Sequence, residues 1–218
     1  MKAAEDSYKH KGLRRQLIEI VRSKGISDEK VLDALFGVPR HLFMDSAFGN
    51  FAYEDRAFPI AEGQTISQPY TVAYQTQLLG VRPFDKILEV GTGSAYQACI
   101  LAELGAQVYT IERQKNLFEA NKTFVWLRKY PGIRLFYGDG YEGLPTFAPF
   151  DKVIVTAAAP AVPQKLVAQL KPGGKMVIPV GEGAVQRMMR LTKGPDGELT
   201  EEIFADFSFV PMLEGKQT

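Results

Sequence analysis

The stretch from Lys86 to Gln97 constrains the fold of this chain more than any other, and it reads Lys-Ile-Leu-Glu-Val-Gly-Thr-Gly-Ser-Ala-Tyr-Gln. Its apolar run predicts a buried strand, two glycines end that strand, and a helical pattern follows Ser94. Glycines let backbone N–H groups approach a ligand closely, and a helix N-terminus favours a carboxylate or phosphate. The stretch therefore predicts a ligand-binding loop in an α/β fold.

Two cofactor motifs compete for this loop. The dinucleotide motif G-x-G-x-x-G/A, counted from Gly91, has Tyr96 in its sixth place, where a large ring obstructs close packing of helix and strand. The motif E-x-G-x-G-x-G begins at Glu89 and is the first motif of methyltransferases that use S-adenosylmethionine (SAM), here with Ala95 in its last place. Either pattern alone also occurs in a glycine turn that only ends a strand.

Composition narrows the class of protein. The 26 basic and 25 acidic residues nearly cancel, which argues against a nucleic-acid partner, since such proteins usually carry a basic excess. The single cysteine, Cys99, excludes an intrachain disulfide and a cysteine-rich metal site, and we expect it to be a small buried residue. His10 and His41 are far apart in the sequence, so we expect structural or solvated histidines and no metal site. Without an apolar run of membrane-spanning length or a signal-peptide core in the sequence, we expect a cytoplasmic protein that does not bind membranes.

From Lys86 onward, strand and helix patterns alternate. This alternation predicts parallel βαβ units in a doubly wound, mostly parallel seven-stranded sheet of Rossmann-like type. A hairpin around Gly194–Gly197 ends the sheet, which suits a methyltransferase better than a dinucleotide fold. The expected strands are 86–91, 107–112, 133–138, 150–156, 174–180, 185–194 and 198–210, and the expected helices are 94–104, 114–129 and 161–170.

We expect one domain over residues 1–218, with a helical extension at 1–52 and the catalytic core at 53–218. Residues 1–12 are polar and expected to fray. Apolar residues at helical spacing predict helices from Leu13 to Gly25 and from Ser27 to Gly37, and a shorter one from Arg40 to Phe51.

Residues 53–69 predict a strand or hairpin with a turn at Gly63, followed by a helix from Pro69 to Gly80. Ser67 or Gln68 lies near the cap of that helix, so capping is the simplest role for the Ser67 hydroxyl.

Polar residues follow the carboxyl ends of the expected strands, where α/β sheets bind ligands. Glu112 ends the second strand and can accept both hydroxyl hydrogens of a ribose, and Asp139 follows the third and can bind an adenine amino group. The small residues from Thr156 to Pro160 leave room for an acceptor beside the sulfonium. Each feature has a simpler role in a turn or in packing, but their order agrees with SAM binding.

Six segments together resemble the protein-L-isoaspartate O-methyltransferase family, over residues from about Leu13 to Pro211. The segment Gly63-Gln-Thr-Ile-Ser-Gln-Pro69 is the most specific of them. The others are 38–43, 89–97, 138–140, 149–160 and 170–174.

This resemblance implies methyl transfer from SAM to the free α-carboxylate of L-isoaspartyl residues in damaged proteins, leaving S-adenosylhomocysteine. The methyl ester then cyclises to a succinimide, whose hydrolysis returns some normal aspartate. The resemblance also implies that Ser67 is the active-site residue. We expect the protein to be a monomer. The candidate cofactor-binding residues are Glu89, Gly91, Thr92, Gly93, Ser94, Glu112, Asp139 and Gly140, and the candidate substrate-binding residues are Thr65, Ile66, Ser67, Gln68, Thr156 and Ala157.

The chemistry needs no strong base, because a carboxyl group with a pKa near 4 is already ionised at neutral pH. We expect the Ser67 hydroxyl to orient one carboxylate oxygen, since no histidine adjoins it to make it a nucleophile. Ala95 departs from the family, which usually has glycine there, and we expect a negative φ at this helix entry.

Three other functions stay open. The first is a SAM-dependent methyltransferase for a small molecule or RNA. The second is a SAM-binding module without catalysis, and the only residue that suggests it is Ala95. The third is a nicotinamide enzyme, and Tyr96 argues against it.

Overall fold

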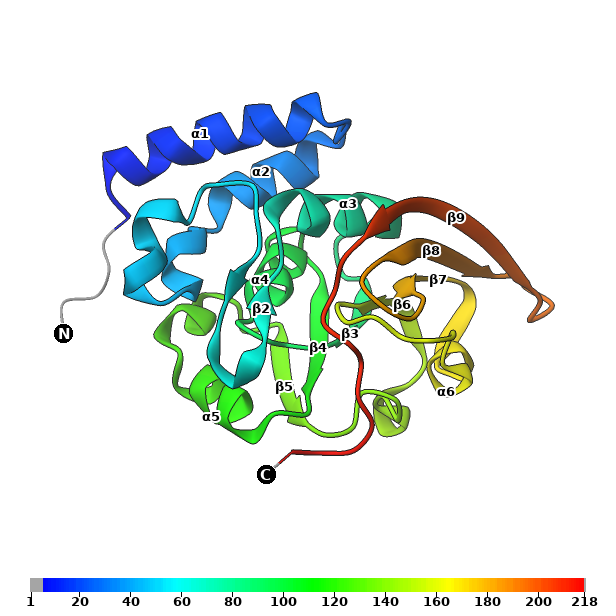
Figure 1. Ribbon diagram of the computed structural model, residues 1–218. Helices are drawn as coiled ribbons and strands as arrows, with labels where there is room; N and C mark the ends of the chain where they lie inside the picture. Colours follow the sequence, from blue (N-terminus) through cyan, green and yellow to red (C-terminus); the bar gives the residue numbers. More distant parts are fainter. Residues whose placement is uncertain (1–5, 218) are drawn as a thin grey trace.

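Seven strands form one sheet, in the spatial order β5 (Ile133–Tyr137), β4 (Gln107–Glu112), β3 (Lys86–Val90), β6 (Phe150–Val155), β7 (Leu170–Val180), β8 (Gln186–Lys193) and β9 (Leu199–Phe207) (Figure 1). The structure is a computed structural model and describes residues 6–217. Neighbouring strands from β5 to β7 are parallel, and β8 and β9 add an antiparallel hairpin. The predicted mostly parallel seven-stranded sheet is confirmed.

Four helices pack on this sheet: α3 (Pro69–Leu79), α4 (Tyr96–Glu103), α5 (Lys115–Thr123) and α6 (Gln164–Ala168). Ile87 of β3 is buried in one cluster with Leu79 of α3. Leu88 of the same strand is buried on the opposite face with Leu166 of α6, as the alternation of side chains along a strand requires. Because β3 pairs with β4 on one side and β6 on the other, the connections diverge at its carboxyl end, where such sheets open a ligand crevice.

The N-terminal residues form helices that lie against α3 and α4, namely α1 (Tyr8–Ser23), α2 (Glu29–Gly37) and the 3₁₀ helices η1 (Arg40–Phe43) and η2 (Ser46–Phe51) (Figure 1). Ser7 caps α1 by accepting a hydrogen bond from the backbone N of His10 at 3.3 Å. The prediction that residues 1–12 fray is therefore wrong from Tyr8 onward, and residues 1–5 lie outside the described residues.

Tertiary packing breaks two of the predicted helices. The helix expected over 114–129 divides into α5 and the 3₁₀ helix η4 (Val125–Lys129), because Phe124 between them is extended. The Phe124 ring lies edge-on to that of Phe43, with centroids 5.2 Å apart, so its packing on the N-terminal helices overrides the helical pattern. The single helix expected from Arg40 to Phe51 is likewise two 3₁₀ helices, separated by extended Met44.

Two further boundaries differ near the end of the chain. The helix expected over 161–170 shortens to α6, and β7 already begins at Leu170, before the predicted start at Gly174. The turn between β8 and β9 is confirmed, since the N–H of Gly197 donates to the carbonyl of Gly194 at 3.1 Å. A short 3₁₀ helix, η5 (Pro145–Phe147), precedes β6.

The last residues leave the sheet and cross its carboxyl edge (Figure 1). The final strand ends at Phe207, short of the predicted residue 210, because the N–H of Phe209 donates to the side chain of Gln186 instead of a strand. The carbonyl of Val210 then accepts from Ala158 beyond β6. This C-terminal segment, residues 208–217, therefore lies over the strand ends. Within residues 6–217, no helix has both the length and the apolar character that a membrane crossing needs.

Candidate active site

The loop after β3 has the conformation expected of a ligand loop. Gly91 has φ +97°, and a Cβ on it would lie 2.5 Å from Oγ1 of Thr156, so only glycine fits. The Thr156 hydroxyl at the end of β6 lies 2.8 Å from the Gly91 carbonyl oxygen and 3.0 Å from that of Val90. The end of one strand thus holds the loop that leaves its neighbour.

Glu112 fixes the same loop from the end of β4. Its Oε2 accepts a hydrogen bond from the backbone N of Gly93 at 2.9 Å, and its Oε1 accepts from that of Gln114 at 2.8 Å. The residue is only 5% exposed. Each carboxylate oxygen can accept more than one hydrogen bond, so Glu112 can still bind the hydroxyls of a ligand.

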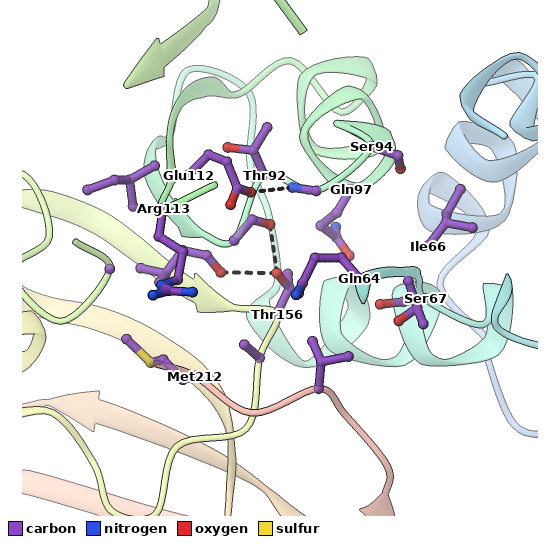
Figure 2. Close-up of a pocket in the computed structure, with 18 of the residues that line it drawn as sticks. Gln64, Ile66, Ser67, Thr92, Ser94, Gln97, Glu112, Arg113, Thr156 and Met212 are labelled. Carbon is purple, nitrogen blue, oxygen red and sulfur yellow. Dashed lines mark hydrogen bonds between the residues drawn. The ribbon is translucent and has the colours of Figure 1, made fainter. Parts of the chain in front are cut away.

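A cavity lies between this loop and the segment before α3 (Figure 2). Glu112 and Ser67 lie on opposite sides of it, with Thr156 between them. Most of the predicted site residues line this cavity: Thr65, Ile66, Ser67, Gly91, Thr92, Gly93, Ser94, Glu112, Gly140, Thr156 and Ala157. Gln68 lines an adjoining groove.

Two predicted cofactor-binding residues, Glu89 and Asp139, do not line the cavity. Asp139 accepts hydrogen bonds from the backbone N of Tyr141 at 2.9 Å and of Gly215 at 2.8 Å, so it fastens the C-terminal segment beside the site. Its contact with adenine stays a prediction. Glu89 is fully buried in β3, in a direct pair with Thr110 of β4.

The pKa of Glu89 is raised to about 8, mainly by burial and less by the nearby Glu112 charge, whereas Thr110 opposes the shift. Neither carboxyl oxygen of Glu89 has a hydrogen-bond partner among the described residues. An unfolded glutamate loses its proton near pH 4.5, so between that pH and about 8 the folded state binds the extra proton. Protonated Glu89 therefore stabilises the fold at low pH, and this contribution disappears as the pH rises toward 8.

Replacing Glu89 with glutamine should flatten the pH dependence of stability. Without SAM, we expect the wild-type free energy of unfolding to fall between pH 5 and 8 more steeply than that of Glu89→Gln, by up to about 1.4 kcal/mol per pH unit. Urea unfolding at a series of pH values measures both slopes. Parallel slopes would contradict a neutral buried carboxyl group at Glu89.

The structure corrects the expectation for Ala95. Its φ is +66°, in the left-handed region, where an alanine is disfavoured by about 1–2 kcal/mol. The residue forms the N-cap of α4, its methyl group is buried beneath the loop, and the helix begins at Tyr96 rather than Ser94. The Tyr96 ring packs edge-on against Phe43 with centroids 5.3 Å apart, so it faces the N-terminal helices and does not separate α4 from the sheet.

Ser67 lies just before α3 but does not cap it. Gln68 is the N-cap and gives no side-chain hydrogen bond to the helix. Asp55 takes that role from a distant loop, since its Oδ1 accepts from the backbone N of Tyr70 at 2.8 Å and its Oδ2 accepts from Gln68 Nε2 at 3.0 Å. No hydrogen bond of the Ser67 hydroxyl occurs among the described residues, so that hydroxyl is available to a ligand.

The comparisons with known proteins agree with this site. The sequence profile of the family described as protein-L-isoaspartate(D-aspartate) O-methyltransferase matches residues 12–217. A protein-L-isoaspartate O-methyltransferase of Cytophaga hutchinsonii is 56% identical over 209 residues, which are 96% of this chain and 94% of the relative. This chain belongs to the protein-L-isoaspartate O-methyltransferase family.

A second relative supports the family, and two solved structures confirm the fold. The protein of the same name from Christiangramia forsetii is 53% identical over 212 residues, covering 97% of this chain and 99% of its own. One solved protein-L-isoaspartate O-methyltransferase superposes with a TM-score of 0.80 and 26% identity, over 91% of this chain and 65% of that one. A putative one from Plasmodium falciparum, solved with S-adenosyl-L-homocysteine, has a TM-score of 0.78 at 24% identity, over 92% and 98% of the two chains.

The methyltransferase site also contains residues that were not predicted from the sequence. Gln97 and Arg113 line the cavity, as does the C-terminal segment from Val210 to Leu213. Arg113 directly follows Glu112 at a strand end, so the rule that predicted Glu112 could have found it. The C-terminal segment has no such sequence signal. It is held there by Arg113, whose Nε donates to the carbonyl of Gly215 at 3.1 Å.

The two histidines meet in this methyltransferase, and neither lines the cavity or the groove. The rings of His10 and His41 lie 3.8 Å apart between centroids, and one potential ligand atom from each, with one from Asp6, falls within 4.8 Å of the others. The Arg14 guanidinium binds both oxygens of Asp6 at 2.8 and 2.9 Å. It also donates to the Tyr53 hydroxyl at 2.9 Å, which directs the hydroxyl hydrogen to His41 Nδ1, 2.6 Å away. A cation would meet the Arg14 charge here, so we regard the cluster as structural.

Proposed function

We propose that this chain transfers the methyl group of SAM to the free α-carboxylate of L-isoaspartyl residues in damaged proteins and peptides. The ester then cyclises to a succinimide, which begins the repair. The observation that carries the proposal is the position of Ser67, whose side chain lines both the cavity and the adjoining groove. An acceptor that enters through the groove meets the cavity at this hydroxyl.

The residues around the cavity fit SAM, the methyl donor of this family. Glu112 offers a buried carboxylate for ribose hydroxyls, and Gly91 and Gly93 line the cavity without side chains. Gly140 and Val90 both line the cavity. A Cβ on Gly140 would lie only 2.6 Å from the Val90 side chain, so glycine is needed for the backbone to pass this close. When bound, SAM supplies an electrophilic methyl group on a positively charged sulfur.

The chain's own part in the reaction is to position the acceptor. The acceptor carboxylate is ionised at neutral pH, so no residue has to remove a proton from it. Among the described residues that line the cavity and the groove, the charged ones are Glu112, Arg113, Lys24 and Asp206, and neither histidine belongs to them. The Ser67 hydroxyl donates to one carboxylate oxygen and leaves the other free to react. Such alignment can lower a barrier by up to roughly 7–11 kcal/mol in ideal cases.

Two peptides that differ only in one L-isoaspartyl or L-aspartyl linkage test this function with methyl-labelled SAM. We expect base-labile label on the isoaspartyl peptide alone. Label on both peptides would show a less selective carboxyl methyltransferase. Label on neither, with SAM still bound in a calorimetric titration, would instead favour a small-molecule or RNA acceptor, or a binding module.

We further propose that the chain works as a monomer in the cytoplasm, as one domain and without a nucleic-acid partner. The shared core of α1, α2, α3 and α4 supports the single domain, and the near-neutral charge supports the absence of a nucleic-acid partner. Light scattering of the purified chain tests the monomer, and a single cooperative unfolding transition tests the domain.

A further inference from the structure

Arg40, the first residue of η1, is a cation inside the protein core. Its side chain is fully buried, and it forms no ion pair with a described residue. Burial lowers the pKa of Arg40 to about 10, so the guanidinium is still charged at neutral pH. A buried charge without a direct counter-ion is costly, and an apolar side chain of similar volume is often as stable or more stable in such a place. Packing alone therefore does not explain an arginine here.

The Arg40 guanidinium joins the two arms of a short hairpin. This hairpin consists of β1 (Phe58–Pro59) and β2 (Thr65–Ile66), which pair only with each other. Arg40 Nη2 donates to the carbonyl of Arg56, before β1, at 3.3 Å and to that of Ile66, at the end of β2, at 3.5 Å. Strands of two residues are too short to hold a hairpin by themselves, so its shape depends on contacts of this kind.

The Ile66 carbonyl belongs to the peptide group that leads into Ser67. Because a peptide group is planar, a hydrogen bond to this oxygen also fixes the plane that contains the Ser67 nitrogen and Cα. On the other side of Ser67, Asp55 binds the Gln68 side chain at 3.0 Å and caps the first turn of α3. The Ser67 hydroxyl has no hydrogen bond within the described structure, so the contacts on its two sides determine where it points.

The Arg40 guanidinium also lies behind the wall of the cavity. Its Cζ is 5.2 Å from the centroid of the Tyr96 ring, within the range of a cation–π contact, and both Tyr96 and Ile66 line the cavity. We propose that Arg40 is a positioning residue that holds the backbone before Ser67 against α4, so that the serine hydroxyl meets the acceptor carboxylate. This inference rests on the proposed function and adds to it the residue that orients Ser67.

The test is a double-mutant cycle between Arg40→Met and Ser67→Ala. We expect Arg40→Met to lower kcat by about 10- to 100-fold, since a displacement of about 1 Å can cost a reaction about 10²-fold. Its dissociation constant for SAM should change less than about threefold. In the Ser67→Ala background the same substitution should lower kcat by less than about twofold, because the hydroxyl that Arg40 positions is already absent. A structural role alone would lower kcat equally in both backgrounds.

Arg14→Met is the matched control, because Arg14 is another arginine buried among the N-terminal helices, at 3% exposed. Its guanidinium binds Asp6 and Tyr53, neither of which lines the cavity or the groove. We express kcat per SAM-binding molecule, counted from the stoichiometry of a calorimetric titration, so that unfolded protein does not contribute. On this basis the kcat of Arg14→Met should stay within about twofold of the wild type, even where its stability falls.

Should Arg40→Met not fold, Arg40→Lys takes its place in the cycle, because it keeps the charge and a donor for the two carbonyls. Its expected loss is about three- to tenfold with Ser67 present and less than about twofold in the Ser67→Ala background. Equal losses in both backgrounds, or wild-type kcat in the Arg40 variant, would overturn the positioning role while the proposed function stands. A wild type that methylates no isoaspartyl peptide would overturn the proposed function, and this inference with it.

Discussion

Replacing Ser67 with alanine is expected to lower the turnover number by about a hundredfold while the dissociation constant for SAM changes less than about twofold. Loss of one well-placed hydrogen-bond donor typically costs an enzyme about 10²–10³ in kcat. The Ser67 hydroxyl has no hydrogen bond within the described structure, and Asp55 rather than Ser67 caps α3. The substitution therefore removes an interaction with the acceptor and no contact of the fold. Steady-state kinetics with saturating isoaspartyl peptide and calorimetric titration of SAM measure the two quantities.

Ser208→Ala is the matched control, because it removes a hydroxyl from another residue that lines the groove. We expect its turnover to stay within about twofold of the wild type, and both variants to unfold at the wild-type temperature. Weak SAM binding by Ser67→Ala would show that this hydroxyl serves the cofactor, and the role of orienting the acceptor would have to be abandoned. Wild-type turnover would place the orienting donor elsewhere in the cavity.

Glu112→Gln is expected to weaken SAM binding by about 10- to 100-fold. The carboxylate accepts hydrogen bonds from the backbone N–H groups of Gly93 and Gln114, and the residue lines the cavity. An amide has only one acceptor oxygen, so its NH₂ group must meet a backbone N–H or turn toward the ribose position. Hydrogen bonds to a charged group are worth about 1.5–3 kcal/mol each, which corresponds to that loss of affinity. Calorimetric titration measures the dissociation constant directly.

Glu89→Gln is the matched control, because it changes a buried carboxyl group on the neighbouring strand that does not line the cavity. Its dissociation constant for SAM should change less than about threefold. Equal losses in both variants would mean that Glu112 acts on the loop rather than on the ligand. At saturating SAM, Glu112→Gln should regain most of the wild-type turnover, since the acceptor side of the site is unchanged.

The topology of the sheet could be predicted from the sequence alone. Strand and helix patterns from Lys86 onward gave the parallel sheet with its terminal hairpin, because the period of apolar residues is a local property of the chain. The glycine loop and Glu112 were also predictable, since the carboxyl ends of parallel strands converge on one edge of the sheet. The specific segment around Ser67 identified the family before any side chain was placed, and the matched profile and relatives confirm that family.

The local sequence pattern mispredicted the backbone conformation where contacts with residues distant in sequence determine it. Phe124 is extended because its ring packs on Phe43, and β9 stops at Phe207 because Gln186 takes the N–H of Phe209. Ala95 is left-handed although its residue type disfavours that conformation, because hydrogen bonds to Thr156 and Glu112 hold the loop before it.

The sequence by itself thus determined the sheet, the cofactor loop and the family, all of which rest on residues close together in the chain or at strand ends. Only the tertiary structure separated Glu112, which faces the cavity, from Glu89, which is buried beneath it. It alone showed that Asp55 caps α3, and that the Ser67 hydroxyl has no hydrogen bond within the described structure. The physical reason is the same in each case: burial and hydrogen-bond partners depend on residues that are remote in sequence, and spacing along the chain does not encode them.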